Sequence, residues 1–578
     1  MGVASRGLLF LCLSLTVADP VASTNHIISN SGGNSYLFPT DASHKINSGF
    51  ADYRSSHFHA GIDISTNRKI GYPVYAARAG YVYRISVSPF GYGKMIVLRH
   101  DDSTFTVYGH LSEFSSDIEK KVDAKQSEAG KYGVNIYLSS SEIKVERGKI
   151  IARTGATGVG GPHLHFEIRG KDFSPIDPLI YSSLDVSGFR TPKIFGVAVR
   201  GFNSDVARVA RVVRSGKEYR SRGEFRMREP FYFIVHAADS YGHGAYKRPP
   251  KFIQLKVDDL QVLSLDLTRV DVDDDLDISS LVDLSLSRRS KTYYKLCVDR
   301  AIPFSVFTPG SPGSGVIGGN FRNGKHTYEI SIEDEDGNRV SVAGTFFLDI
   351  PSSAGKNANA GGNFMLSLQP FDERTISPST SLTLNFPTNC FDRDVDVTVD
   401  QNSPTSFSIL PANRQLRRRI DVVWKVDDRD VTLFRRVRNH WTPVFSKNDG
   451  KVLTAEIAYK TGEFSLQKDK TPPTVGKIRF ARKNPFYISV APNDLSRVFV
   501  YFKVSDSMSG VDTDHILLKV GDRTYLCEYD VDKHSAFCSV SRERLLAAKK
   551  VELSVHDNAG NERRIVSRTR AGSFGKRV

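Results

Sequence analysis

The sequence has few cysteines, no long apolar run after its first residues, and fewer acidic than basic side chains. Five cysteines in 578 residues are too few for a disulfide scaffold, and none has the Cys-x-x-Cys spacing of a zinc ribbon. No later stretch reaches the ~20 apolar residues of a transmembrane helix, and no dinucleotide-binding or P-loop motif is present. With 40% hydrophobic and 25% charged residues, the composition excludes collagen-like and disordered chains.

The N-terminus has the pattern of an export signal. Arg6 precedes an apolar run from Gly7 to Val17, which is too short to span a bilayer and ends in small residues. This pattern predicts a secretory signal peptide over residues 1–22, with a buried N-terminal strand as the alternative. Leu11 before Cys12 argues against a lipoprotein. We therefore expect an exported protein, located in the periplasm, at the cell surface or outside the cell.

The basic side chains outnumber the acidic ones by 79 to 64, a net charge of +15. Such a surplus favours anionic partners, although a solvated basic surface explains it equally well. The arginines 417–419, 435, 436 and 438 lie among aromatic residues. Because export argues against nucleic acid, we expect an anionic envelope polymer, or solvation alone, at this cluster.

Alternation of apolar and polar residues dominates the chain and predicts a mostly β fold, with an N-terminal antiparallel β domain followed by immunoglobulin-like β-sandwich domains. One of the few helical patterns runs from Ser541 to Lys550. The predicted divisions are a signal peptide at 1–22, a first domain at 24–190, a β domain at 191–350, a linker at 351–364, a β domain at 365–467 and an immunoglobulin-like sandwich at 468–570.

Histidines gather in three short segments of the first domain, HFHAGID, TVYGHL and GPHLHFEIRG. In an extended strand His163, His165 and Glu167 point to one face, because side chains alternate with period two. His59 and Asp63 share a face in the same way. Imidazole and carboxylate are the ligands of zinc sites, so these segments predict a metal centre rather than isolated core histidines.

In this order, HAGID, YGHL and GPHLHFEI resemble the lysostaphin/LytM-type zinc metallopeptidases (the duplicated hybrid motif family), which cut peptidoglycan peptides. The resemblance covers about residues 45–181, and the whole layout resembles exported members from Bacteroidetes-like bacteria. It implies that His59, Asp63 and His165 bind Zn²⁺ and that His110 and His163 act as catalytic, non-ligand histidines. Which of these two is the base and which stabilises the oxyanion stays open.

The resemblance implies a zinc-dependent metalloendopeptidase that hydrolyses stem or cross-bridge peptides of peptidoglycan. A catalytically inactive activator or scaffold of wall hydrolases is one alternative. A secreted protease with a substrate outside the wall is the other. No further cofactor and no nucleic-acid partner are expected.

Several other residues have weaker interpretations. Glu167 either orients a ligand imidazole or is a solvated strand carboxylate. His57 has no assigned role, and His100 is expected to be structural. The segment Asp117–Glu142 is interpreted as an insertion near the cleft, acting as a lid or substrate wall.

The remaining sequence features are acidic and thiol groups. The acidic run Asp271–Asp277 lacks the glycine and glutamate of a calcium loop. Cys527 and Cys538 flank a polar turn and are expected to form a disulfide. Cys297 and Cys390 lie in different predicted domains and are expected to stay unpaired.

Overall fold

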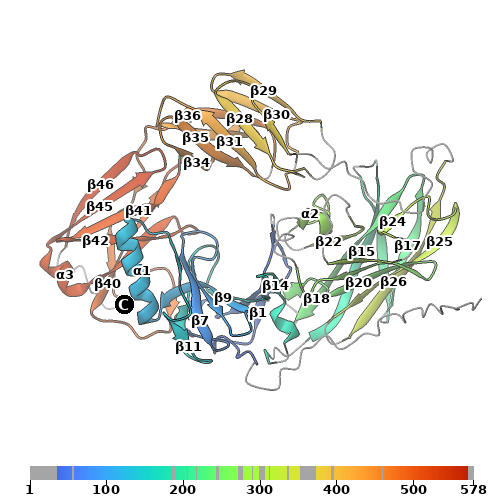
Figure 1. Ribbon diagram of the computed structural model, residues 1–578, viewed down its shortest axis with the longest axis horizontal. Helices are drawn as coiled ribbons and strands as arrows, with labels where there is room; N and C mark the ends of the chain where they lie inside the picture. The colour runs from blue at the N-terminus through green and yellow to red at the C-terminus, as the bar shows by residue number, and fades with distance from the viewer. Residues whose placement is uncertain are drawn as a thin grey trace, which may run out of the picture.

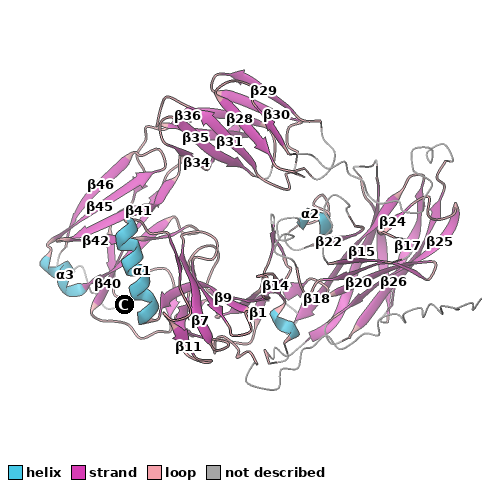
Figure 2. Cartoon of the chain, viewed as in Figure 1, coloured by secondary structure: helices cyan, strands magenta, loops and turns pink. Residues whose placement is uncertain are grey.

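Strands dominate the structure, a computed structural model, so the expected mostly β fold is confirmed (Figures 1 and 2). Among the described residues no helix is both long and apolar enough to cross a bilayer. The expected signal peptide, most of the expected linker and the acidic run 271–277 lie outside the description. The structure describes residues 35–569 except 55–56, 182, 185–188, 203, 205, 217, 242–245, 271–277, 289–290, 299–305, 311–312, 335–336, 352–372, 389, 392–395, 415 and 459.

The first domain is built on one large antiparallel sheet. Its elements are β1 (Ile46–Ser48), β2 (Tyr53–Arg54), β3 (His57–Phe58), β4 (Ile62–Ser65), β5 (Lys69–Ile70), β6 (Pro73–Tyr75), β7 (Gly80–Val87), β8 (Lys94–Arg99), β9 (Phe105–Phe114), α1 (Ser116–Ala129), β10 (Val134–Tyr137), β11 (Lys144–Val145), β12 (Ile150–Thr154), β13 (His163–Arg169), β14 (Pro175–Ile176) and the 3₁₀ turn η1 (Pro178–Ile180). The main strand order is β1-β4-β13-β9-β8-β7-β10.

Strand β13 lies between β4 and β9 and carries the histidines at the centre of the sheet. Leu164, Phe166 and Ile168 are fully buried in the core on one face. The alternation of a strand therefore directs His163 and His165 to the opposite face. The register pairs His165 with Asp63 on one side and with Gly109 on the other, which brings three distant segments of sequence together.

The segment Asp117–Glu142, interpreted as a lid or substrate wall, contains most of helix α1 and the whole of strand β10; the helix was not expected, and the role of the segment stays a prediction. Ile118 and Val122, four residues apart, are the buried residues of the helix, and the left-handed Gly130 ends it. Only two apolar residues line the buried face, so the helical periodicity is weak in the sequence. The helix packs against β10, β9 and β7.

The second domain contains a 12-stranded sheet and a core that extends into the first domain. Phe50, shortly before the β2–β3 hairpin, and Phe58, in β3, are buried within this core. The segment that leads to His59 is thus anchored in the second domain. The elements are β15 (Phe189–Gly201), β16 (Arg208–Ser215), β17 (Glu218–Met227), β18 (Phe231–Tyr241), β19 (Tyr246–Arg248), β20 (Phe252–Val257), β21 (Leu260–Asp266), α2 (Ile278–Leu281), β22 (Tyr293–Leu296), β23 (Phe307–Pro309), β24 (Val316–Ile317), β25 (Gly324–Glu333) and β26 (Arg339–Leu348).

The third domain pairs two five-stranded sheets, β27-β28-β31-β35-β34 and β29-β30-β36-β32-β33, around the buried Trp424 and Phe407. Alternating burial along its strands accounts for this two-layer arrangement. The strands are β27 (Arg374–Ile376), β28 (Leu382–Phe386), β29 (Thr398–Ser403), β30 (Ser406–Leu410), β31 (Ile420–Lys425), β32 (Val431–Val437), β33 (His440–Val444), β34 (Ser446–Asn448), β35 (Val452–Ile457) and β36 (Glu463–Lys468).

The last domain also has two sheets, and its helix α3 falls within the predicted helical segment. Cys527 and Cys538 are buried, face each other across β43 and β44 and have their Sγ atoms 2.7 Å apart as free thiols; the disulfide stays a prediction. The elements are β37 (Thr474–Val475), β38 (Arg479–Ala481), β39 (Ile488–Ser489), β40 (Arg497–Ser505), β41 (Val511–Val520), β42 (Arg523–Leu526), β43 (Glu528–Asp530), β44 (Ser535–Ser541), α3 (Arg542–Ala547), β45 (Lys550–Asp557) and β46 (Glu562–Arg568).

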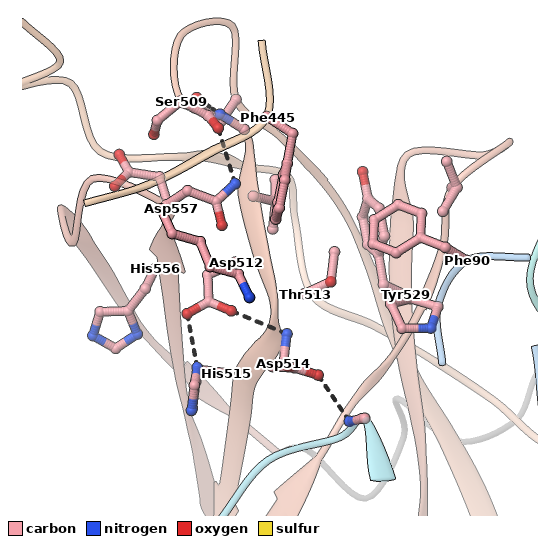
Figure 3. Close-up of a pocket in the computed structure, with 18 of the residues that line it drawn as sticks. Phe90, Phe445, Ser509, Asp512, Thr513, Asp514, His515, Tyr529, His556 and Asp557 are labelled. Atoms are coloured by element: carbon pink, nitrogen blue, oxygen red, sulfur yellow. Dashed lines mark hydrogen bonds and ion pairs between the residues drawn. The ribbon is translucent and has the colours of Figure 1, made fainter. Parts of the chain in front are cut away.

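The last domain packs against the first, so the two ends of the described chain lie in neighbouring domains (Figure 1). Strand β39 pairs in parallel with β5, and the backbone N–H of Gly133 donates to Asp514 at 2.8 Å. A cavity of about 1440 Å³ lies where the first, third and last domains meet, lined among others by Phe90, Phe445 and Tyr529 (Figure 3).

A buried ion pair joins the first domain to the second. Asp177 and Lys251 are in direct contact, with side chains 0% and 1% exposed. Asp177 also accepts the backbone N–H of Leu179 at 3.0 Å, which starts the 3₁₀ turn η1. Because removal of one partner from a buried pair leaves the other charge uncompensated, this contact is a strong determinant of stability.

We expect Lys251→Met to lower the free energy of unfolding by about 3–5 kcal/mol, the cost of stranding a buried carboxylate. Urea titration followed by circular dichroism measures the change. The matched control is Lys550→Met, which breaks a pair whose side chains are 60% and 43% exposed, and which should cost less than about 1 kcal/mol. Equal losses in the two variants would contradict the assignment.

Candidate metal centre and catalytic histidines

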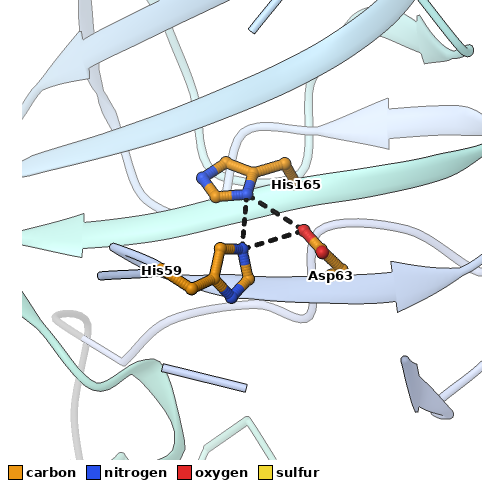
Figure 4. Close-up of side chains that lie close together, drawn as sticks. All are labelled: His59, Asp63 and His165. Atoms are coloured by element: carbon orange, nitrogen blue, oxygen red, sulfur yellow. Dashed lines mark hydrogen bonds and ion pairs between the residues drawn. The ribbon is translucent and has the colours of Figure 1, made fainter. Parts of the chain in front are cut away.

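Three side chains converge on one point above β4 and β13 (Figure 4). His59 Nε2 and His165 Nδ1 each lie 3.0 Å from Asp63 Oδ1, and the two nitrogens are 3.0 Å from each other. His59 and His165 are buried, and Asp63 is partly exposed. The structure therefore brings together the three residues that the sequence proposed as metal ligands.

The far nitrogen of each of these imidazoles has a fixed hydrogen-bond partner. His59 Nδ1 donates to the carbonyl of Gly49 at 2.6 Å, and His165 Nε2 donates to Glu167 Oε1 at 2.8 Å. With their protons on these outer nitrogens, both neutral rings turn a lone pair toward Asp63. Such outer contacts fix ring orientation and tautomer in metal sites.

The resulting group of three electron-pair donors requires a positive charge at its centre. Two imidazole lone pairs and a carboxylate oxygen within 3.0 Å of one another repel unless a proton or a metal ion lies among them. Two nitrogens and one oxygen form the donor set of a catalytic zinc site that keeps a further position open. The residues present therefore fit a zinc ion.

Without a metal, a proton supplies this charge. Burial opposes the charged form of His165, but its hydrogen bonds to Asp63 and Glu167 outweigh burial and raise the pKa of His165 to about 9. Burial also opposes ionisation of Asp63, yet the charge of His59 and the histidine hydrogen bonds hold the pKa of Asp63 well below its usual value. The site is thus built for a cation.

Glu167 is fully buried, so the solvated alternative for this residue is wrong. Burial alone raises the pKa of this carboxyl, but the charge of Arg169 outweighs burial and lowers it. The hydroxyl of Tyr92, at 2.6 Å, and Nε of Arg169, at 2.5 Å, also donate hydrogen bonds to this carboxylate. Glu167 therefore stays ionised and holds the ring of His165.

The two histidines proposed as catalytic lie beside the three ligands. His163 Nε2 is 3.5 Å from Asp63 Oδ1, and the rings of His110 and His163 are 4.4 Å apart between centroids. His110 Nδ1 donates to the carbonyl of Thr157 at 2.8 Å, and His163 Nδ1 donates to that of Gly161 at 2.7 Å. These bonds leave Nε2 of His110 available for water or substrate, while Nε2 of His163 faces Asp63.

His110 is neutral at ordinary pH. Burial and the neighbouring His163 and His165 lower the pKa of His110 to about 3. Gly109 lets this region of β9 approach the site, since a Cβ there would lie 3.3 Å from the Cβ of His165 and 3.2 Å from the ring of Tyr92. A neutral imidazole with a free nitrogen is a proton acceptor.

Other residues near the site were missed or left open by the sequence. Arg54 donates to Asp63 Oδ2 at 3.2 Å, and Tyr92 bonds Glu167, but neither belongs to a recognisable spacing. His57 is exposed. His100 is buried and bonded to Ala79 and Thr106, away from the ligands, in keeping with a structural role.

A second group of carboxylates, Asp469, Asp506 and Asp557, converges in the last domain. Backbone N–H groups satisfy these side chains, for example that of Ser509 on Asp469 and that of Gly510 on Asp506. These hydrogen bonds connect Asp469, at the start of the last domain, with the turn that contains Ser509.

Comparison with known proteins identifies the first domain. Residues 57–135 match the family model described as Peptidase family M23, a range that includes His59, Asp63 and His110 and ends before His163. The lipoprotein NlpD/LppB homolog of Pseudomonas aeruginosa is 31% identical over 121 residues, which cover 21% of this chain and 32% of that protein. The resemblance to LytM-type peptidases is thereby confirmed.

Two further proteins are similar. The DD-carboxypeptidase/endopeptidase Mpg of Neisseria meningitidis is 31% identical over 121 residues, 20% of this chain and 22% of that protein. The crystal structure of a zinc-containing peptidase from Vibrio cholerae is 29% identical, covers 27% of this chain and 40% of that chain, and has a TM-score of 0.19. This chain matches about a third of the length of the first curated relatives.

We expect Glu167→Gln to weaken zinc binding by about 10–100-fold, the usual effect of losing a carboxylate behind a ligand histidine, while leaving the fold intact. Competition against a fluorescent zinc chelator measures the affinity. His165→Ala should remove stoichiometric zinc altogether, and His57→Ala is the control that should retain it. Full zinc content in purified His165→Ala would show that the ligand set is wrong.

We also expect zinc binding to release a proton. His165, with a pKa of about 9, carries a proton in the metal-free protein at pH 7, and a ligand imidazole must be neutral. The apparent affinity should therefore fall about tenfold for each unit that the pH drops below 9, from this group alone. Calorimetry in buffers of different ionisation enthalpy counts the protons, and a count of zero at pH 7 would contradict this picture.

Proposed function

We propose that the first domain, a LytM-type peptidase domain similar to family M23, is a zinc-dependent metalloendopeptidase that hydrolyses peptide bonds of peptidoglycan in cell wall remodelling. The observation that carries this proposal is the pair of non-ligand histidines beside the ligand group: both His110 and His163 have Nδ1 bonded to a backbone carbonyl, and His163 Nε2 lies 3.5 Å from Asp63. A site that only stores metal has no need of them.

His59, Asp63 and His165 would hold the ion. Zinc bound there would acidify a water molecule and polarise the scissile carbonyl. His110, neutral and buried, is suited to take a proton at Nε2. His163 already donates from Nδ1 to Gly161, so it would donate from Nε2 to the developing oxyanion or to the leaving amine in its doubly protonated form. Because Thr157 and Gly161 fix Nδ1 of each ring, the orientation of Nε2 is set before substrate arrives.

The scaffold alternative predicts a different set of residues. An inactive scaffold does not require a buried, neutral histidine such as His110 beside the ligand group, or an ionised Glu167 behind His165. All five site residues are present and in contact range. The observations therefore favour the enzyme over the scaffold.

The cellular context follows from the same proposal. Peptidoglycan stem or cross-bridge peptides require an exported enzyme, so we place the protein in the periplasm or at the cell surface. Binding of an anionic envelope polymer by the arginines of the third domain also stays a prediction. There Arg419 pairs with Glu456 and Arg436 with Glu463, so part of that charge is already neutralised.

We expect His110→Ala and His163→Ala each to lower the rate of peptide hydrolysis by about 10²–10⁴-fold, the loss typical of a positioned acid–base group. Zinc content and unfolding midpoint should stay near those of the wild type, because neither residue is a ligand. The assay is solubilisation of purified sacculi, with products identified by mass spectrometry.

Because both histidines act on one step, the double variant should lose less than the product of the two single losses. The matched control is His100→Asn, a buried histidine whose contacts are elsewhere. A double variant that still solubilises sacculi at the wild-type rate would contradict the roles. Zinc-loaded wild type that cuts soluble peptides but not sacculi would favour the secreted protease with another substrate.

A further inference from the structure

The last domain contacts the first domain at Lys94, which pairs with Leu111, the residue that follows His110 in β9. Lys94 Nζ, at the start of β8, lies 2.8 Å from Glu528 Oε2 on β43, and both side chains are 16% exposed. Burial disfavours the charge on Lys94, but the carboxylates of Glu528 and Glu119 outweigh burial and raise the pKa of Lys94. The two residues thus form a charged, largely desolvated pair across the domain boundary.

Lys94 is bonded to two residues near His110, the backbone of Ser112 and the side chain of Thr157. Its Nζ donates to the carbonyl of Ser112 at 3.0 Å, and its backbone N–H donates to Thr157 Oγ1 at 2.9 Å. Thr157 Oγ1 in turn donates to the carbonyl of Leu111 at 2.8 Å, and the Thr157 carbonyl accepts from His110 Nδ1. A continuous series of bonds therefore runs from Glu528 to the imidazole of His110.

His110 needs such restraint, because its backbone is in the left-handed region with φ of +58°. This conformation is unfavourable for a residue with a Cβ and persists only where surrounding contacts determine it. β9 is irregular here, since the register with β8 shifts between Lys94 and Ile96. The bonds from Tyr92, whose carbonyl accepts the His110 N–H at 2.8 Å, and from Thr157 hold the strained backbone.

We propose that the last domain is a positioning element of the peptidase site, acting through Glu528, Lys94 and Thr157 to hold His110 in its strained, productive orientation. The proposal rests on the proposed function and adds to it a role for a domain that supplies no ligand. Activity then depends on docking between segments more than 400 residues apart in sequence.

A second contact reaches the other non-ligand histidine. The backbone N–H of Gly160 donates to Asp532 Oδ2 at 2.9 Å, and the neighbouring Gly161 carbonyl accepts from His163 Nδ1. Asp532 is exposed, so this contact is weaker than the Lys94–Glu528 pair. Thr157 and Gly161, which orient the two histidines, lie in one loop between β12 and β13. The β43–β44 hairpin of the last domain touches this loop at Gly160 and touches Lys94, which is bonded to Thr157.

The same interface provides a matched control. Asp514 accepts the N–H of Gly133 at 2.8 Å (Figure 3), and this carboxylate, like that of Glu528, joins the last domain to the first. Gly133 follows helix α1 and has no bond to the loops that hold His110. Asp514→Ala therefore weakens docking without cutting the connection to the site.

The test compares Glu528→Ala, Asp514→Ala and Thr157→Val in the full-length protein. Zinc content, unfolding midpoint, kcat and KM are measured on a soluble peptidoglycan peptide. We expect Glu528→Ala to lower kcat by about 10–100-fold, with KM and zinc content within about twofold. Asp514→Ala should leave kcat within about twofold of the wild type, since it touches no positioning bond.

Thr157→Val cuts the same connection while leaving the domain interface intact, and it should lower kcat to a similar extent. The Glu528→Ala, Thr157→Val double variant should lose less than the product of the single losses, because both act through one set of bonds. If Glu528→Ala does not fold, the test rests on Thr157→Val and Glu528→Gln. Glu528→Gln should also lower kcat, by a factor several-fold smaller than that expected for Glu528→Ala.

Wild-type kcat in Glu528→Ala or in Thr157→Val overturns the inference, as do equal losses in Glu528→Ala and Asp514→Ala. Either result, obtained with an active wild type, leaves the proposed function standing. A zinc-loaded wild type that hydrolyses no peptidoglycan peptide contradicts the proposed function instead, and removes the inference with it.

Discussion

Repulsion among three electron-pair donors is the constraint from which the rest of the site follows. His59 Nε2, His165 Nδ1 and Asp63 Oδ1 lie 3.0 Å apart with the imidazole protons on their outer sides. This arrangement is stable only around a cation, and it must be held from outside. Gly49 and Glu167 hold the rings, Glu167 is held by Arg169 and Tyr92, and the β4–β13 register supplies the spacing.

The neighbouring domains extend this restraint. Phe50 and Phe58, buried in the core of the second domain, anchor the segment that carries His59. On the other side, the last domain contacts Lys94 and the loop that orients His110 and His163. In Figure 1 the first domain lies between the second domain and the last domain, so it is supported on two sides.

The site was largely predictable from sequence because its chemistry is concentrated in short segments. Alternation in HLHFEI places two histidines and a carboxylate on one face. Antiparallel pairing of the three segments then brings the other site residues beside them. The buried state of Glu167, the contacts of Tyr92 and the Lys94–Glu528 pair were not predictable, since each depends on which loops and domains meet in space. Helix α1 was missed because Ile118 and Val122 alone mark its apolar side.

Zinc-dependent hydrolysis of peptidoglycan peptides is the proposed function of the first domain, and it can be tested on the whole protein. The most direct measurement is digestion of purified sacculi in H₂¹⁸O by the full-length protein, first loaded with zinc, then stripped by a chelator, then reloaded. We expect new amino groups and one ¹⁸O in each new carboxylate with the loaded and reloaded protein, and neither with the stripped one. Stoichiometrically loaded protein that releases no labelled peptide would contradict the proposed function.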